Sequence, residues 1–188
     1  MSIYCWPPWS FHHGYGARNG QKGGGVLPYL NVKGQNIITV SSLAKGFGIP
    51  IAVLSGAKNM IQEFKEKSKT RLNNSPVSNA HLTAAQNALL KNKQRGERWR
   101  NQLLKRVIYL KRQLHEIGLV TGTSYFPVQI IRNLTKNQAI KLHNHLKVKG
   151  IETLLLAKHG RQKPALGILL NVNHKVGDID YLIQEIYF

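Results

Sequence analysis

The apolar positions are spaced most regularly between residues 93 and 117, and there they predict the longest helix of the chain. An apolar residue recurs every three or four positions, which is the repeat of one helix face: Trp99, Leu103, Val107, Leu110, Leu114 and Ile117. The opposite face carries seven cations, Arg95, Arg98, Arg100, Lys105, Arg106, Lys111 and Arg112. Because a charged helix face is usually solvated, we expect the apolar stripe to pack on a sheet and the basic face to meet water.

After this helix, strand-like and helix-like patterns alternate. Continuous apolar runs predict three strands, at 126–132, 151–157 and 165–171. Thr135 and Gln138 have the spacing of a capping box, so a helix should begin after Thr135, and it should end at Gly150. A last helix from about Asp178 would bury one apolar face, made of Ile179, Leu182, Ile183 and Ile186. Residues 93–188 therefore read as a small α/β domain led by a long linking helix.

The pattern is more broken in the first half of the chain. Two apolar runs, 36–40 and 50–55, predict strands of the type that is buried on both faces. A helix at 58–67 should follow and bury Met60, Ile61 and Phe64.

Two further segments of the first half lack a strand pattern. Residues 1–35 are expected to be irregular, with a glycine-rich loop between Gly14 and Gly25. The run Asn73-Asn74-Ser75-Pro76 should interrupt the chain before a separate alanine-rich helix over about 80–89.

Composition narrows the class of protein. The 188 residues include 42% hydrophobic side chains, which is typical of a folded chain. The charge of +19, from 27 Lys and Arg against 8 Asp and Glu, suggests nucleic acid, an anionic surface or an acidic ligand. One cysteine allows no internal disulfide, and neither a signal peptide nor an apolar run of about 20 residues is present. These features predict a cytoplasmic protein without a membrane span.

One lysine stands where the first predicted strand ends. The β-branched segment 37–40 leads into Ser41, Ser42, Leu43 and Ala44, and Lys45 is followed by Gly46-Phe47-Gly48. We expect a loop of small residues that holds an amine at the end of a buried strand. A desolvated amine loses its proton more readily, so it can form a Schiff base with an aldehyde. The alternative is that Lys45 is one more surface cation.

This segment resembles the cofactor-lysine segment of fold-type I pyridoxal-phosphate enzymes, with a hydroxyl three positions before the lysine and a small-Phe-Gly turn after it. Within that class the chain is most similar to the α-oxoamine synthases and class I/II aminotransferases. Further landmarks are Gly56, the Asn-Ser-Pro break, the long helix and Asn171-Val172-Asn173-His174. The resemblance implies an α/β fold, the C-terminal half of such a transferase. Residues 1–92 would be a remnant of the large-domain sheet that binds pyridoxal phosphate, and 93–188 the small domain.

The resemblance also implies roles for individual residues. Lys45 would be the catalytic Schiff-base lysine, and Ser42 would donate a hydrogen bond to the cofactor phosphate. Asn74 or Ser75 would contact the partner's cofactor across a homodimer interface, although a helix N-cap before Pro76 explains them equally well. His174 is expected to be structural.

Three positions depart from the family pattern. Ala44 stands where a second hydroxyl is usual. Relatives place an aspartate against the pyridine nitrogen, but this chain has no aspartate before Asp178, and only His12 and His13 lie near the expected region. The arginine that often binds the substrate carboxylate falls at Gly167, which leaves Arg132 and Arg161 as replacements.

The sequence therefore predicts a pyridoxal 5'-phosphate-dependent transferase that acts on an amino acid. The departures, and the missing first half of the large domain, suggest a truncated member whose activity alone is doubtful. Two alternatives remain: a non-catalytic basic protein that binds nucleic acid or another polyanion through the basic helix face, and an inactive remnant. No metal site is expected.

Overall fold

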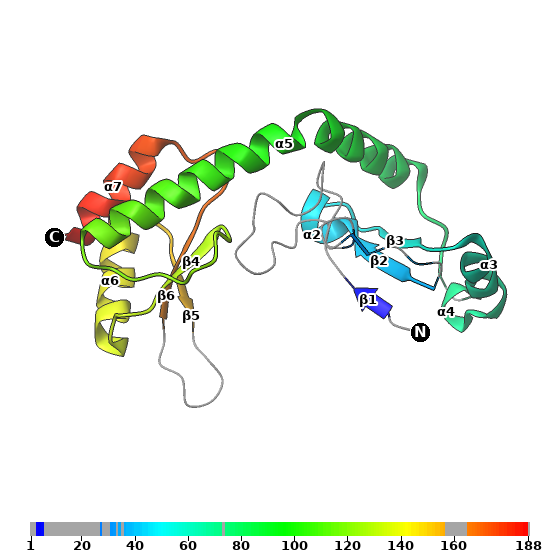
Figure 1. Cartoon of the computed structure of the whole chain (residues 1–188), viewed down its shortest axis with the longest axis horizontal. Coiled ribbons are helices and arrows are strands. Elements are labelled where there is room, and N and C mark those ends of the chain that lie inside the picture. The colour runs from blue at the N-terminus through cyan, green and yellow to red at the C-terminus, as the bar shows by residue number, and fades with distance from the viewer. Residues whose placement is uncertain are drawn as a thin grey trace. The chain divides into compact units, whose positions relative to one another are not determined.

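The computed structural model shown in Figure 1 describes residues 3–5, 27, 31–32, 34, 36–72, 74–156 and 165–187. The chain divides into two compact units, and the boundary between Glu97 and Arg98 lies inside helix α5 (Asn79–Glu116). The predicted division after residue 92 falls in the same helix. Each unit is described by itself below.

Helix α5 corrects one prediction. The alanine-rich helix and the long linking helix were expected to be separate, but they form one helix of 38 residues. No proline or glycine stands between Leu89 and Lys93, so nothing there removes a hydrogen bond or favours a turn.

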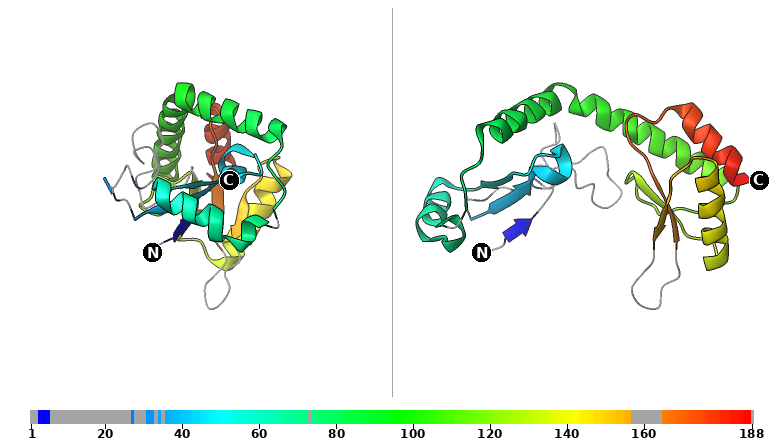
Figure 2. Two further views of the ribbon diagram at one scale, coloured as in Figure 1. Left: turned by 90° about the vertical axis from the view of Figure 1, so that its right-hand side faces the viewer. Right: turned by 180° about the vertical axis from the view of Figure 1, so that it is seen from behind.

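The N-terminal unit contains a sheet of three strands, β1 (Ile3–Cys5), β2 (Ile38–Ser42) and β3 (Ala52–Ser55). The middle strand β2 pairs parallel with β1 and antiparallel with β3, as Figure 2 shows from behind. The prediction that residues 1–35 are irregular is therefore wrong at β1. A three-residue strand is too short to show alternation in sequence, and its pairing partner lies more than thirty residues away.

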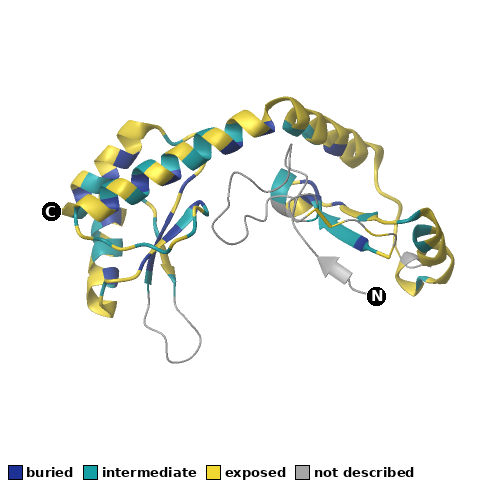
Figure 3. Ribbon diagram, viewed as in Figure 1, coloured by how far each residue is buried: buried dark blue, intermediate teal, exposed yellow. Residues whose placement is uncertain are grey.

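Burial in this unit is lower than predicted. Only Ile38 of β2 is buried, and β3 has no buried residue, so the expectation of two buried strands is wrong. Helix α3 (Lys58–Lys67) has the predicted bounds, but it also has no buried residue. Met60 and Ile61 are half-buried and Phe64 is exposed. Figure 3 shows the exposed surface of α3, which is followed by the short helix α4 (Lys69–Leu72).

The C-terminal unit contains a second sheet, made of β4 (Val128–Ile131), β5 (Leu154–Leu156) and β6 (Ala165–Leu169). The central strand β6 pairs antiparallel with β4 on one side and β5 on the other. Two helices complete the unit, α6 (Lys136–Val148) and α7 (Val176–Tyr187). The order of elements is the predicted one, and each strand is shorter than its apolar run.

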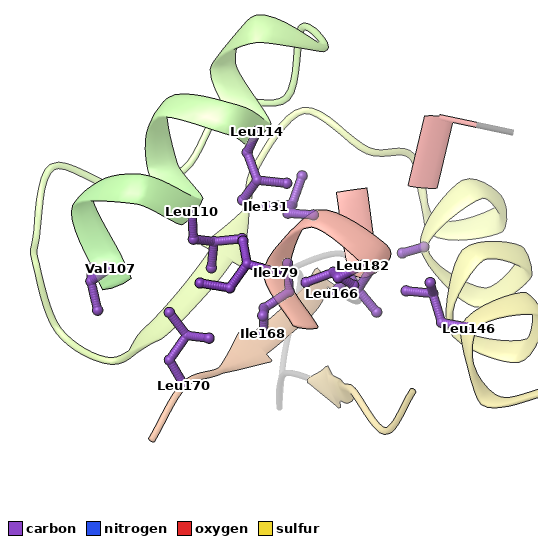
Figure 4. Close-up of a cluster of buried hydrophobic side chains, with 11 residues drawn as sticks. Val107, Leu110, Leu114, Ile131, Leu146, Leu166, Ile168, Leu170, Ile179 and Leu182 are labelled. Atoms are coloured by element: carbon purple, nitrogen blue, oxygen red, sulfur yellow. The ribbon is translucent and has the colours of Figure 1, made fainter. Parts of the chain in front are cut away.

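The core of this unit confirms the predicted apolar stripe. Val107, Leu110 and Leu114 of α5 have no exposed surface. They pack on one face of the sheet together with side chains from α6 and α7, as Figure 4 shows for Ile131, Leu146, Leu166, Ile168, Leu170, Ile179 and Leu182. Leu103 and Ile117 pack at the edge of this cluster, and Trp99 is half-buried.

The basic face of α5 is not simply solvated, which corrects the second expectation for this helix. Arg100 is 8% exposed. Arg106 donates a hydrogen bond of 2.6 Å to the carbonyl of Val172, and Lys111 donates to the carbonyls of Gly122 and Ser124. Arg106 and Lys111 therefore connect α5 to turns of its own unit. A period of 3.6 residues separates apolar from polar positions, but it does not show which polar side chains will meet another turn.

Helix α6 begins as its sequence predicts. The Thr135 hydroxyl accepts a hydrogen bond from the backbone N–H of Gln138, and the Gln138 side chain accepts one from the backbone N–H of Thr135. After the helix, Gly150 takes a left-handed conformation with φ 75°. Ala139 and Leu146 are fully buried. The predicted start of this helix is confirmed, and the helix ends at Val148, two residues before the predicted stop at Gly150.

Removal of this cap should be measurable. We expect Thr135→Ala to lower the free energy of unfolding by about 1 kcal/mol, because one backbone N–H at the helix start loses its acceptor. Chemical denaturation followed by circular dichroism measures this change. Lys136→Ala, at the exposed first position of the helix, is the control and should change it by less than about 0.5 kcal/mol. Equal losses in both variants would contradict a capping role for Thr135.

No helix among the described residues combines the length and the apolar character that a membrane span requires.

Candidate functional site

Lys45 lies in a short helix and not in the loop that its small neighbours suggested. Strand β2 ends at Ser42, and helix α2 (Leu43–Phe47) begins at the next residue. The two serines that were expected in the loop, Ser41 and Ser42, are the last residues of the strand. Lys45 thus occupies the middle of a single helical turn directly after a strand.

Apolar contacts and backbone hydrogen bonds hold this turn in place. Leu43 is 4% exposed and belongs to a buried cluster with Ile49, Ile51 and Ala85, and Phe47 and Ala88 pack against the same cluster. The backbone N–H of Leu43 donates to the carbonyl of Ile51 at 2.8 Å. Since Leu43 and Phe47 are four residues apart, one face of the turn is anchored at both ends. The backbone of Lys45 lies between these two anchors.

Gly48 ends the turn. Its φ is 68°, in the left-handed region where a side chain would be strained, and its N–H donates to the carbonyl of Ala44 at 3.2 Å. Gly48 therefore has a structural reason, because a glycine at this position lets the chain leave the helix and reach Ile49 and Ile51.

Ser42 occupies the N-cap position of α2 with an extended backbone, φ −84° and ψ 119°. Serine at this position normally caps the helix, but the hydroxyl of Ser42 makes no capping hydrogen bond. The side chain is half-buried at the junction of β2 and α2. The hydroxyl of Ser42 is thus not used to cap the helix that it precedes.

Ser75 lies in the irregular segment before α5 and is exposed, as is Asn74. The helix N-cap that was weighed for these residues belongs instead to Ser78. The hydroxyl of Ser78 accepts a hydrogen bond from the backbone N–H of His81 at 3.3 Å. The N-cap explanation for Asn74 and Ser75 is therefore wrong. Among the described residues, no hydrogen bond connects Ser75 to the β2–α2 junction.

Gly56 and Gly167 are close-contact positions. A Cβ atom on Gly56 would lie 3.1 Å from the carbonyl oxygen of Ile37, so this glycine lets β3 end against the start of β2. Gly167 lies in the middle of β6, where a Cβ atom would be 3.3 Å from the Cβ of Leu154. The place where an arginine was expected by resemblance is thus filled by leucine. Of the replacements, Arg132 is exposed beyond the end of β4, and Arg161 lies outside the described residues.

His174 closes a turn before α7. Its Nδ1 accepts a hydrogen bond of 3.2 Å from the backbone N–H of Asn171, whose side-chain oxygen accepts one of 2.8 Å from the N–H of Asn173. Arg106 of α5 donates to the carbonyl of Val172 in the same turn. These contacts give the side chains of Asn171 and His174 a structural role in the turn.

The carboxylates of α7 are also engaged locally. Asp178 accepts a hydrogen bond of 2.7 Å from the backbone N–H of Lys175. Asp180 accepts one of 2.5 Å from the hydroxyl of Tyr109, and this bond is the main reason that the pKa of Tyr109 is raised. Glu185 is 8% exposed and pairs at 3.2 Å with both His145 and Lys149. The helical period predicted neither the burial of Glu185 nor its partners.

No group of three His, Cys, Asp or Glu side chains that could hold a metal ion occurs in the part of the chain that the structure describes. His12 and His13, the histidines near the expected position of the family's aspartate, lie outside those residues.

Comparison with known sequences gives a family match. The profile of the aminotransferase class I and II family matches residues 13–165. Curated relatives include 8-amino-7-oxononanoate synthase from Thermosipho melanesiensis, 24% identical over 175 residues, and from Pseudomonas aeruginosa, 27% identical over 182 residues. The alignments cover 92% and 93% of this chain but 44% of each relative. The chain therefore spans less than half the length of these relatives.

Comparison with solved structures gives the same fold. An 8-amino-7-oxononanoate synthase from Francisella tularensis has a TM-score of 0.77 at 18% identity, over 98% of this chain and 53% of that one. The serine palmitoyltransferase of Sphingomonas wittichii has a TM-score of 0.76 at 15% identity, over 91% and 44%. The predicted fold class and the resemblance to one half of a fold-type I transferase are confirmed.

Proposed function

Because this chain belongs to the aminotransferase class I and II family, we propose that it binds pyridoxal 5'-phosphate through Lys45, in the manner of a transferase that acts on an amino acid. The observation that carries the proposal is the junction of β2 and α2. There a serine hydroxyl that the helix does not use stands three residues before a lysine, on a turn held by Leu43 and Phe47. Names of the relatives, 8-amino-7-oxononanoate synthase and serine palmitoyltransferase, support the amino-acid transferase class.

The residues at this junction fit part of the cofactor. The Ser42 hydroxyl is a neutral donor at the end of a strand, suited to a phosphate oxygen. The Lys45 amine would form the covalent link to the aldehyde. When bound, pyridoxal phosphate supplies an electron sink for reactions at the α-carbon of an amino acid. The chain's part is to hold the phosphate, position the amine and orient the ring.

The residues fit the pyridine nitrogen less well. A carboxylate beside this nitrogen keeps it protonated, and both aspartates of the chain follow residue 177, where Asp178 and Asp180 already accept hydrogen bonds. We therefore propose weak cofactor binding and slow chemistry for this chain alone. Ser75 is exposed, as a residue that reaches a second copy's cofactor must be, and a homodimer belongs to the same proposal.

The polyanion alternative receives no specific support from the basic face of α5. Arg106 donates to a backbone carbonyl of its own unit, and Arg100 is buried. Fewer cations of this face are thus free to meet phosphates than the sequence suggested.

The role of Ser42 can be measured by a single hydroxyl deletion. We expect Ser42→Ala to weaken binding of pyridoxal phosphate roughly tenfold to a hundredfold, since a hydrogen bond to a charged group contributes about 1.5–3 kcal/mol. Titration of the full chain, followed by absorbance and fluorescence, gives the dissociation constant. Ser41→Ala removes a neighbouring half-buried hydroxyl from the same strand and is the matched control. Unchanged affinity in Ser42→Ala, or equal losses in both variants, would remove Ser42 from the site.

A further inference from the structure

Two cations from different elements of the C-terminal unit meet at Gly122. The Nζ of Lys111, on α5, donates a hydrogen bond to the Gly122 carbonyl and one of 3.2 Å to the carbonyl of Ser124. The guanidinium of Arg132, just beyond β4, lies next to the position that a Cβ atom would take on the same glycine. A Cβ atom on Gly122 would be 3.0 Å from its Nη2 and 3.5 Å from its Cζ. Gly122, which has no side chain, thus lies between the ammonium of Lys111 and the guanidinium of Arg132.

The backbone around these cations is fixed by hydrogen bonds. The N–H of Arg132 donates to the carbonyl of Val120 at 2.8 Å, and Thr121 forms a β-bridge with Ile131. The side chain of Asn133 accepts from the N–H of Val120 at 3.0 Å and donates to the carbonyl of Gly118 at 2.8 Å. The loop that carries Gly122 is therefore tied to the end of β4, where Arg132 begins.

The two positive charges have no negative partner among the described residues. Neither Lys111 nor Arg132 takes part in an ion pair there, and the guanidinium of Arg132 makes no hydrogen bond to a described residue. Burial lowers the pKa of Lys111, and the charge of Arg132 lowers it further. The centroid of the Tyr125 ring lies 5.2 Å from the Lys111 Nζ, and the ring presents its face to the ammonium. The positive charge of Lys111 is thus disfavoured by its neighbour Arg132 and would be stabilised by an anion.

We infer that Lys111 and Arg132 form a binding site for a small phosphate dianion. Two positive charges match the two negative charges of a phosphate monoester or of inorganic phosphate near neutral pH. The planar guanidinium offers a pair of parallel N–H donors, and Lys111 retains one N–H beyond those that it gives to Gly122 and Ser124. Gly122 leaves the space in which the guanidinium lies. The site belongs to the C-terminal unit and contains neither Ser42 nor Lys45.

The experiment is a titration of the full chain, without pyridoxal phosphate, with inorganic phosphate, followed by isothermal calorimetry at constant ionic strength. Arg132→Gln removes one charge from the site, and Gly122→Ala keeps the charge but displaces the guanidinium. The alanine is tolerated by the backbone, because φ of Gly122 is not in the left-handed region. Lys105→Gln removes one charge from an exposed position on α5 and is the matched control.

We expect Arg132→Gln and Gly122→Ala to weaken phosphate binding at least tenfold, and Lys105→Gln to change it less than twofold. Acetate, a monoanion, should bind at least tenfold more weakly than phosphate. A loss in Lys105→Gln as large as in Arg132→Gln would show that net charge alone binds phosphate and would overturn the inference. A loss in Ser42→Ala with none in Arg132→Gln would assign phosphate to the β2–α2 junction, and would overturn the inference without affecting the proposed function.

Discussion

Leu110→Ala should lower the free energy of unfolding of the C-terminal unit by about 2–5 kcal/mol, the largest stability effect that we expect from one substitution. Leu110 has no exposed surface and packs within the cluster that joins α5 to β4, β6 and α7. Truncation to alanine removes apolar contacts and leaves a cavity that tightly packed neighbours cannot fill. Because a small domain is stable by only about 5–15 kcal/mol, this loss should be evident in urea denaturation followed by circular dichroism.

Ile108→Ala is the matched control, since it removes an aliphatic side chain two positions earlier in the same helix. Ile108 is 46% exposed, so its truncation should cost less than about 1 kcal/mol. Similar losses in Leu110→Ala and Ile108→Ala would mean that the apolar stripe of α5 is not the core of the C-terminal unit.

Lys45→Ala should abolish covalent attachment of pyridoxal phosphate to the chain. The expectation follows from the chemistry of the proposed link, because an imine to the aldehyde needs a primary amine and alanine has none. Absorbance of the full chain in the presence of the cofactor should show the imine in the unchanged protein and only free pyridoxal phosphate in the variant.

The control for this experiment is Lys58→Ala, which removes an exposed lysine at the start of α3 in the same unit. Its spectrum should match that of the unchanged protein. If Lys45→Ala retained the imine absorbance, another lysine would carry the cofactor and the assignment of Lys45 would be wrong.

The C-terminal unit could be predicted from the sequence because its signals are local. The stripe through Val107, Leu110 and Leu114 repeats with the helical period, and the capping box at Thr135 satisfies its hydrogen bonds within three residues. The pairing order β4-β6-β5 is not a local property. The apolar runs predicted where the strands lie in the sequence, but not which strands pair with each other.

The N-terminal unit was predicted less well, for a physical reason. Strand β1 has three residues and depends on pairing with β2, so nothing in its own composition marks it. Burial of α3 was inferred from its apolar positions, but Phe64 remains exposed because a periodic pattern shows which face is apolar and not whether another element covers it.

In the candidate site, too, local features could be predicted from the sequence and contacts between distant residues could not. Ser42 and Lys45 could be found because their spacing on a strand-to-helix junction is a short sequence pattern. The proximity of Lys111 and Arg132 could not be predicted from the sequence. It depends on a loop that returns to the end of β4, and on the fact that Gly122 in this loop has no side chain. The partners of Glu185 are His145 on α6 and Lys149 just after that helix, and they are likewise forty and thirty-six residues away.

The most direct test of Lys45 as the cofactor lysine is to reduce a mixture of the full chain and pyridoxal phosphate with borohydride, and to locate the label by peptide mapping. Reduction makes the link between amine and cofactor permanent, so the modified lysine survives digestion. We predict that the label is found on Lys45 at low cofactor excess and that Ser42→Ala lowers the labelled fraction. Labelling scattered over exposed lysines such as Lys58 and Lys67, with Lys45 no more modified than they are, would contradict the proposal.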